Sequence, residues 1–143
     1  MTTEINKLEA IHSFTVMPRD CNFNTDKESD KTSILFGGKI LHDMDFAAAK
    51  VARRATYGVG MDMIVTASMD RTNFERPAFI GDIITYIATV KAFGTTSIQI
   101  RIKVKRESLK GHIEDICSSN MTFVTIKNGK PFPHGLSFDK LKQ

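Results

Sequence analysis

Asp45 is the residue whose type and position most clearly predict chemistry. It falls within residues 37–57, where apolar residues recur at helical spacing, and it lies at the border of their arc. A carboxylate there loses hydration and is a candidate functional residue, although it could instead cap a neighbouring loop. Asp43 falls on the opposite, basic arc, where we expect a surface pair with Lys39.

Two consecutive glycines, Gly37 and Gly38, stand at the start of the same segment. Glycines at a helix N-terminus leave backbone N–H groups open to a ligand, and the helix dipole adds partial positive charge. Such donors suit an oxyanion, although the pair could equally form a turn that needs unusual backbone angles. His42 lies toward the polar side of the helix and is expected to be a surface or packing residue.

The sequence gives little support for a cysteine nucleophile or a metal site. The two cysteines, Cys21 and Cys117, are far apart, form no CxxC motif and have no base nearby in sequence. They are expected to be free thiols in a reducing compartment. The four histidines are scattered singly with no HxH or HExxH spacing, so no metal site is expected.

The elements that must position these residues form an α+β pattern. The helix is expected from Gly37 to about Tyr57, roughly 30 Å long. Its apolar arc consists of Ile40, Leu41, Met44, Ala48, Val51, Ala52 and Ala55. Strands are expected at Phe14–Met17, Ile64–Phe74, Ile83–Phe93, Ser97–Arg106 and Ser118–Ile126, with a polar loop over Cys21–Ser33. The simplest packing wraps an antiparallel sheet around the long helix.

Polar residues share one face of the strand that begins at Ser97, namely Ser97, Gln99, Arg101, Lys103 and Lys105. They indicate either a solvated sheet surface or a phosphate-binding strip. The formal net charge of +4 over 143 residues is too weak and dispersed to indicate nucleic-acid binding. With no secretory pattern at the N-terminus and no membrane-length apolar run, the expected location is the cytoplasm.

Several motifs occur in a set order along the chain. They are FGGKILHDMDFAAA (36–49), VTASMDRTNFERP (65–77), Gly81-Asp82 and GTTS (94–97), preceded by MPRDCN (17–22). Together they resemble the hotdog-fold acyl-CoA thioesterases of the YciA and cytosolic acyl-CoA hydrolase type. The resemblance implies one hotdog domain over residues 1–143, with a core of about 14–126 and a tail after Pro133.

The resemblance also implies roles for individual residues. Asp45 matches the catalytic carboxylate, as general base or nucleophile, and the Gly38 N–H matches the oxyanion donor, with Ser68 as a further catalytic candidate. The substrate-binding positions that it implies are Phe36, Gly37, Thr66, Gly94, Thr95, Thr96 and Ser97. Thr66 and Ser68 would lie on a strand facing the site across a dimer interface.

The implied partner is acyl-CoA, with coenzyme A as part of the substrate and no separate cofactor. The implied assembly is a homodimer, or a hexamer made of three dimers. The sequence differs from the family over Asn24–Lys31, an apparent insertion before Phe36, and at residues 32–35, where the family usually has an Asn and a Gly. Two other functions remain. One is a non-catalytic acyl-CoA sensor or scaffold. The other is a hydroxyacyl-thioester dehydratase, which needs an active-site histidine paired with an acid, and no histidine lies in the Phe36 turn.

Overall fold

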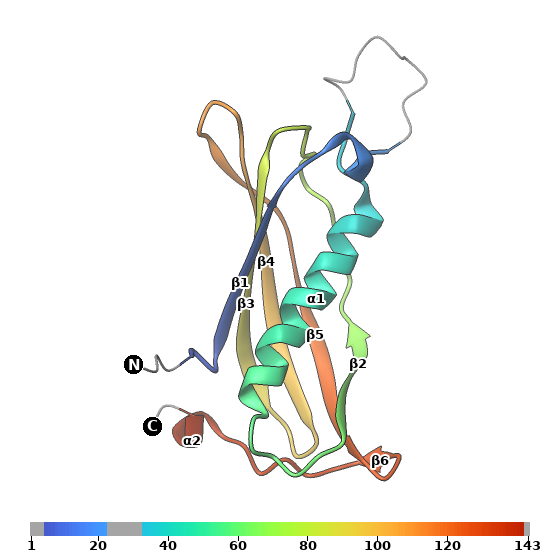
Figure 1. Ribbon diagram of the computed structural model, residues 1–143, viewed down its shortest axis with the longest axis vertical. Helices are drawn as coiled ribbons and strands as arrows, with labels where there is room; N and C mark the ends of the chain where they lie inside the picture. Colours follow the sequence, from blue (N-terminus) through green and yellow to red (C-terminus); the bar gives the residue numbers. More distant parts are fainter. Residues whose placement is uncertain (1–4, 23–32, 142–143) are drawn as a thin grey trace.

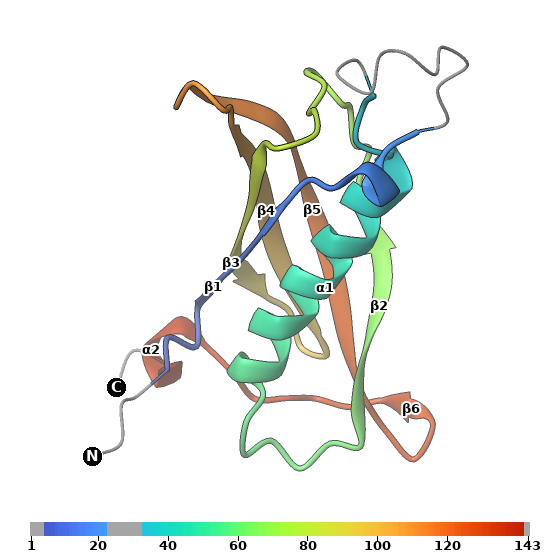
Figure 2. The same ribbon diagram turned by 45° about the horizontal axis from the view of Figure 1, so that its top comes forward.

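A curled antiparallel sheet wrapped around one long helix makes up the protein (Figures 1 and 2). The computed structural model describes residues 5–22 and 33–141. The helix is α1 (Gly37–Ala55), and the long strands are β1 (Glu9–Thr15), β2 (Met63–Met69), β3 (Ile83–Phe93), β4 (Ser97–Glu107) and β5 (Ile113–Lys127). Three short elements complete it: η1 (Pro18–Asp20), β6 (Lys130–Pro131) and α2 (Phe138–Leu141). The α+β hotdog expectation is confirmed.

The strand order explains how the helix is enclosed. The strands follow the order β1-β3-β4-β5-β2, with β6 pairing to β5, and every pairing is antiparallel. The edge strands β1 and β2 therefore lie on either side of α1, which packs against all five long strands (Figure 1). Side chains of one face of the sheet form the core, among them Ile98, Ile100 and Ile102, all fully buried.

The buried face of α1 is wider than its apolar arc. Ile40, Met44 and Val51 are buried as expected, but Leu41 is 36% exposed and Asp43 is only 3% exposed. The expectation that Asp43 lies on a solvated surface is therefore wrong. The reason is that the curled sheet brings β1 and β3 over the side of the helix that carries Lys39 and Asp43.

Strand limits differ from the expectation where long-range pairing decides them. The first strand covers Glu9–Thr15 and not Phe14–Met17, because Pro18–Asp20 already form the 3₁₀ turn η1. The second ends at Met69 and not Phe74, and the chain then continues without regular strand structure. The fifth begins at Ile113 and not Ser118, because Glu114 and Asp115 pair with Arg106 and Lys105 of β4.

The packed region also extends beyond the expected core. Ala10 is buried, and Leu136, Phe138 and Leu141 pack against the core from the expected tail. The insertion Asn24–Lys31 and most of the loop around it lie outside the described residues. No helix within the described ranges is long and apolar enough to cross a membrane.

Candidate active site

The N-terminus of α1 presents the two glycines between aromatic rings. As the first two residues of the helix, Gly37 and Gly38 have N–H groups with no carbonyl partner within the helix. A Cβ atom at Gly38 would lie 2.7 Å from the Phe36 ring, and one at Gly37 would lie 3.4 Å from the Phe74 ring. Phe36 and Phe74 are 55% and 46% exposed. Glycine at position 38 thus lets an aromatic ring lie close to the backbone at the helix start.

Asp45 lies on the side of α1 that faces β2. Its side chain is half-buried, and the Thr66 hydroxyl of β2 donates a hydrogen bond of 2.7 Å to its Oδ1 atom. A carboxylate accepts such a bond in its ionised form and is oriented by it. The structure therefore brings together two of the predicted site residues, Asp45 and Thr66, through a direct contact.

A β-bulge separates Ser68 from this pair. In the β2–β5 ladder, Thr66 pairs with Phe123 while Ser68 pairs with Thr122, so two residues of β2 span one of β5. Phe123 is buried in the core, and Thr122 belongs to the opposite face of the sheet. Ser68 accordingly does not lie on the face of Thr66 within one chain.

Gly38 and Asp45 are too far apart to act on one atom from the same chain. Seven residues separate them, which amounts to about 10 Å along the helix axis at ~1.5 Å per residue. An oxyanion donor and a base must each lie about 3 Å from the group they serve. Helical spacing places both residues on nearly the same side of α1, as is needed if they are to form two halves of one kind of site.

The turn at Gly94–Ser97 joins β3 to β4 at the end of the sheet where α1 ends (Figure 1). Ser97 of β4 pairs with Val124 of β5. The next pair is Ile98 with Phe123, and Phe123 pairs on its other side with Thr66 of β2. Two strand spacings, about 10 Å, thus separate β4 from β2 at this level. Within one chain the turn is near the Asp45 level of the sheet and distant from Gly37 and Gly38.

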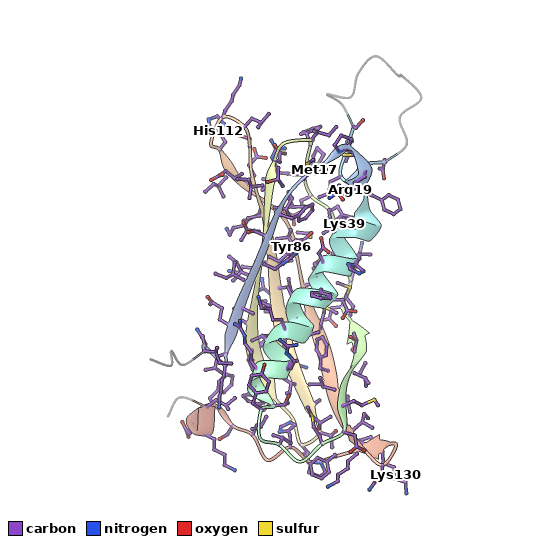
Figure 3. All side chains as sticks on the ribbon, in the orientation of Figure 1. Met17, Arg19, Lys39, Tyr86, His112 and Lys130 are labelled. Carbon is purple, nitrogen blue, oxygen red and sulfur yellow. The ribbon has the colours of Figure 1, made fainter. Side chains whose placement is uncertain are left out.

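Asp43 has a different environment from Asp45. Lys39 Nζ lies 3.2 Å from Asp43 Oδ2, His42 Nδ1 lies 3.1 Å from Oδ1, and the buried Tyr86 hydroxyl donates to Oδ2 at 3.4 Å. Burial, followed by the Asp43 charge, raises the pKa of the Tyr86 hydroxyl far above its ordinary value. Lys39 belongs to the first turn of α1, and Tyr86 lies beside the first half of the helix (Figure 3). This carboxylate is thus engaged by partners on both oxygens and serves as a structural centre.

A pocket of about 440 Å³ opens beside the helix N-terminus. Its walls are mainly apolar, and they comprise Asn22, Ile34, Leu35, Gly37, Ile40, Phe74, Glu75, Arg76, Pro77 and Ala78. Sequence reasoning did not identify Asn22 or Phe74 as site residues. Asn22 belongs to the motif MPRDCN and Phe74 to the motif VTASMDRTNFERP, and that membership is the one signal that could have marked them.

The remaining candidates lie apart from this site. Arg101, Lys103 and Lys105 line a shallow pocket of about 260 Å³ on the sheet face away from α1, where Lys105 pairs with Asp115 at 2.8 Å and lowers its pKa. Burial raises the pKa of the Cys117 thiol to about 11, and burial with the Asp20 charge raises that of Cys21, so neither is an activated nucleophile. The described ranges contain no cluster of three or more metal-ligating side chains.

Known proteins have sequences similar to that of this chain. Residues 32–111 match the model of the thioesterase superfamily. The protein VdlD of Helicobacter pylori is 30% identical over 129 residues, which cover 90% of this chain and 67% of VdlD. The acyl-CoA thioester hydrolase YciA of Escherichia coli is 33% identical over 88 residues, 62% of this chain and 58% of YciA. The chain thus spans under two thirds of YciA.

Solved structures agree with the sequence comparison. An acyl-CoA hydrolase from Bacillus cereus has a TM-score of 0.77 at 30% identity, covering 96% of this chain and 79% of its own. An acyl-CoA hydrolase from Staphylococcus aureus, solved with butyryl coenzyme A and coenzyme A, has a TM-score of 0.73 at 26% identity, covering 90% and 71%. A hexameric thioesterase from Yersinia pestis has a TM-score of 0.73 at 27% identity, covering 88% and 94%. The chain belongs to the thioesterase superfamily.

Proposed function

We propose that this protein hydrolyses acyl-CoA thioesters to a free acid and coenzyme A. The observation that carries the proposal is the Asp45 carboxylate, held by the Thr66 hydroxyl on a helix that begins with two glycines. Relatives named as acyl-CoA thioester hydrolases, and a neighbour solved with butyryl coenzyme A, support the substrate class.

The proposed active site is shared between two subunits. The separation of about 10 Å between Gly38 and Asp45 along α1 prevents both from reaching one thioester within a chain. In a two-fold symmetric dimer, Asp45 of one protomer can approach Gly38 of its partner, and the symmetry produces two equal sites. β2 is an edge strand, so its free edge is available for such pairing. Ser68 would act from the partner side. Assembly of three dimers into a hexamer is proposed by analogy with the Yersinia pestis neighbour.

The two halves of this site have different roles in hydrolysis. Asp45 either takes a proton from water as the water oxygen attacks the thioester carbon, or attacks that carbon itself to form an anhydride that water then cleaves. The Gly38 N–H donates to the oxyanion that develops on the carbonyl oxygen. The carbon–sulfur bond then breaks, and coenzyme A leaves as a thiolate that takes up a proton.

Two regions would hold the rest of the substrate. We assign the acyl chain to the apolar pocket beside Phe36 and Gly37, because it opens next to the oxyanion donors. We assign the coenzyme A moiety to the Gly94–Ser97 turn, because strand pairing places Ser97 near the level of Thr66, the partner of Asp45. No separate cofactor is needed. The free thiols Cys21 and Cys117 support a reducing compartment such as the cytoplasm as the place of reaction.

Thiol release from a panel of acyl-CoAs, short to long, tests the proposal. The wild type should hydrolyse part of the panel, and Asp45→Asn, which keeps the shape of the side chain, should lose roughly 10²–10⁴-fold in kcat. Asp43→Asn is the matched control on the same helix: folded protein should retain activity, because Asp43 belongs to the Lys39–Tyr86 network. An Asp45→Asn variant as fast as wild type would contradict the assignment. Binding of coenzyme A without hydrolysis of any substrate would favour the sensor function.

A further inference from the structure

The C-terminal segment, residues 132–141, is bound to the Gly94–Ser97 turn. It leaves β6 and crosses the end of the sheet at which α1 ends, where α2 lies beside the start of β1 (Figure 1). Leu136 and Phe138 pack against the hydrophobic core, and the Phe138 ring lies edge-on to Phe93 at 5.1 Å between centroids. The segment is therefore a part of the folded domain that contacts the turn between β3 and β4.

His134 makes the polar contacts between the segment and the turn. Its side chain is buried, with the residue 7% exposed. Its backbone N–H donates to the Thr95 carbonyl at 3.1 Å, and its Nε2 atom lies 2.9 Å from the Ser97 carbonyl. The Leu136 N–H donates to Nδ1 at 2.9 Å, so Nδ1 carries no proton and Nε2–H is the donor to Ser97. One neutral imidazole thus ties the segment and the turn together.

A third carbonyl of the turn, that of Thr96, is also occupied. The Thr96 carbonyl accepts from the backbone N–H of Thr125 at 3.0 Å and from its hydroxyl at 3.2 Å. Among the described residues, no acceptor is bonded to the N–H groups of Thr95 and Thr96. With three of its four carbonyls engaged by the protein, the turn offers the N–H groups of Thr95 and Thr96 to a ligand, which suits the phosphates of a nucleotide.

We infer that His134 is a positioning residue for coenzyme A, which holds the Gly94–Ser97 turn in its binding conformation through Nε2–H and the backbone N–H. The inference rests on the proposed function, because it takes the turn to contact the coenzyme A moiety. His134 touches neither Asp45 nor the helix N-terminus in the structure, so its effect belongs to substrate affinity and not to the chemical step.

Two substitutions separate the contacts of the imidazole. In His134→Gln the amide nitrogen reaches toward the place of Nε2 and can still donate to the Ser97 carbonyl. In His134→Asn the shorter amide reaches only the place of Nδ1, keeps the bond from Leu136 and loses the bond to the turn. His112→Asn is the matched control, because His112 is exposed in the loop at the opposite end of the sheet (Figure 3).

The readouts are KM and kcat on acyl-CoA and on the S-acyl-N-acetylcysteamine with the same acyl group, which lacks the nucleotide. For acyl-CoA, His134→Asn should raise KM roughly fivefold to tenfold with kcat unchanged, since one hydrogen bond that orders the turn is lost. His134→Gln and His112→Asn should remain close to wild type. All variants should hydrolyse the truncated thioester equally well.

An unchanged KM in His134→Asn would overturn the inference, and so would an equal loss on both thioesters, which indicates general destabilisation. Failure of the proposed function has a different signature, namely a wild type that hydrolyses no acyl-CoA. In that case the affinity for coenzyme A, measured by calorimetric titration, still tests the inference. Weaker binding by His134→Asn alone supports it, and equal binding by all variants refutes it.

Discussion

Mixing two inactive variants tests whether the site is shared between subunits. Gly38→Pro removes the proposed oxyanion donor at a helix position whose N–H has no partner within the helix. Gly37 precedes it and has no Cβ to clash with the proline ring, while the exposed Phe36 ring must move aside. Asp45→Asn removes the base from the other half of the site.

The expected magnitudes follow from the geometry. Alone, Gly38→Pro should lose about 10²–10³-fold in kcat and Asp45→Asn about 10²–10⁴-fold. In a dimer with one chain of each kind, one site combines an intact Asp45 with an intact Gly38, and the other site lacks both. In a sample that contains only such mixed dimers, one site in two is intact, so the sample should regain about half of wild-type activity per subunit.

The assay is thiol release by the two variants co-expressed with different affinity tags and purified through both. Circular dichroism of each variant checks that the helix is intact. Two differently tagged Asp45→Asn chains, purified in the same way, serve as the control and should stay inactive. A mixed sample as inactive as its parents would refute the shared site, because each site would then use Asp45 and Gly38 of one chain despite their separation of about 10 Å.

Three further results are expected. Thr66→Val should lower kcat roughly tenfold by releasing Asp45 while Thr66→Ser should not, as measured by thiol release. Ile34→Phe should narrow the apolar pocket and lower kcat/KM for the longest acyl-CoAs by about fourfold for each methylene displaced, with the shortest substrates unaffected. Tyr86→Phe should lower the free energy of unfolding by about 1–2 kcal/mol at pH 7 and make its decrease at alkaline pH less steep, as measured by urea unfolding from pH 8 to 11.

The sign of the alkaline effect follows from the raised pKa of Tyr86. Burial and the Asp43 charge make the folded protein hold the hydroxyl proton more tightly than the unfolded chain does. The protonated Tyr86 hydroxyl therefore contributes its full stabilisation below about pH 10. This contribution is lost as the pH rises above that value, by up to about 1.4 kcal/mol per pH unit. The raised pKa of Cys117 acts in the same direction from the ordinary value of its thiol upward. A variant with the same alkaline slope as wild type would exclude Tyr86 as the cause.

Local patterns were sufficient for the elements whose residues repeat regularly. The helix was predicted to begin at Gly37, where α1 begins, and the strands 83–93 and 97–106 agree with β3 and, to within one residue, with β4. Period-2 and period-3.6 spacing depend on neighbours in the chain, so they can be recognised without the fold. The ordered motifs likewise identified the family and singled out Asp45.

Tertiary structure alone decided which partner each site residue has. The burial of Asp43 depends on β1 and β3 curling over the helix, and the separation of Ser68 from Thr66 depends on a bulge in the pairing with β5. The contact of His134 with the turn at Ser97 joins residues far apart in the chain. Sequence by itself determined the helix, two strands, the family and the candidate carboxylate. The contacts between elements were decided only by the fold, because they depend on strand order and sheet curvature, which local spacing does not encode.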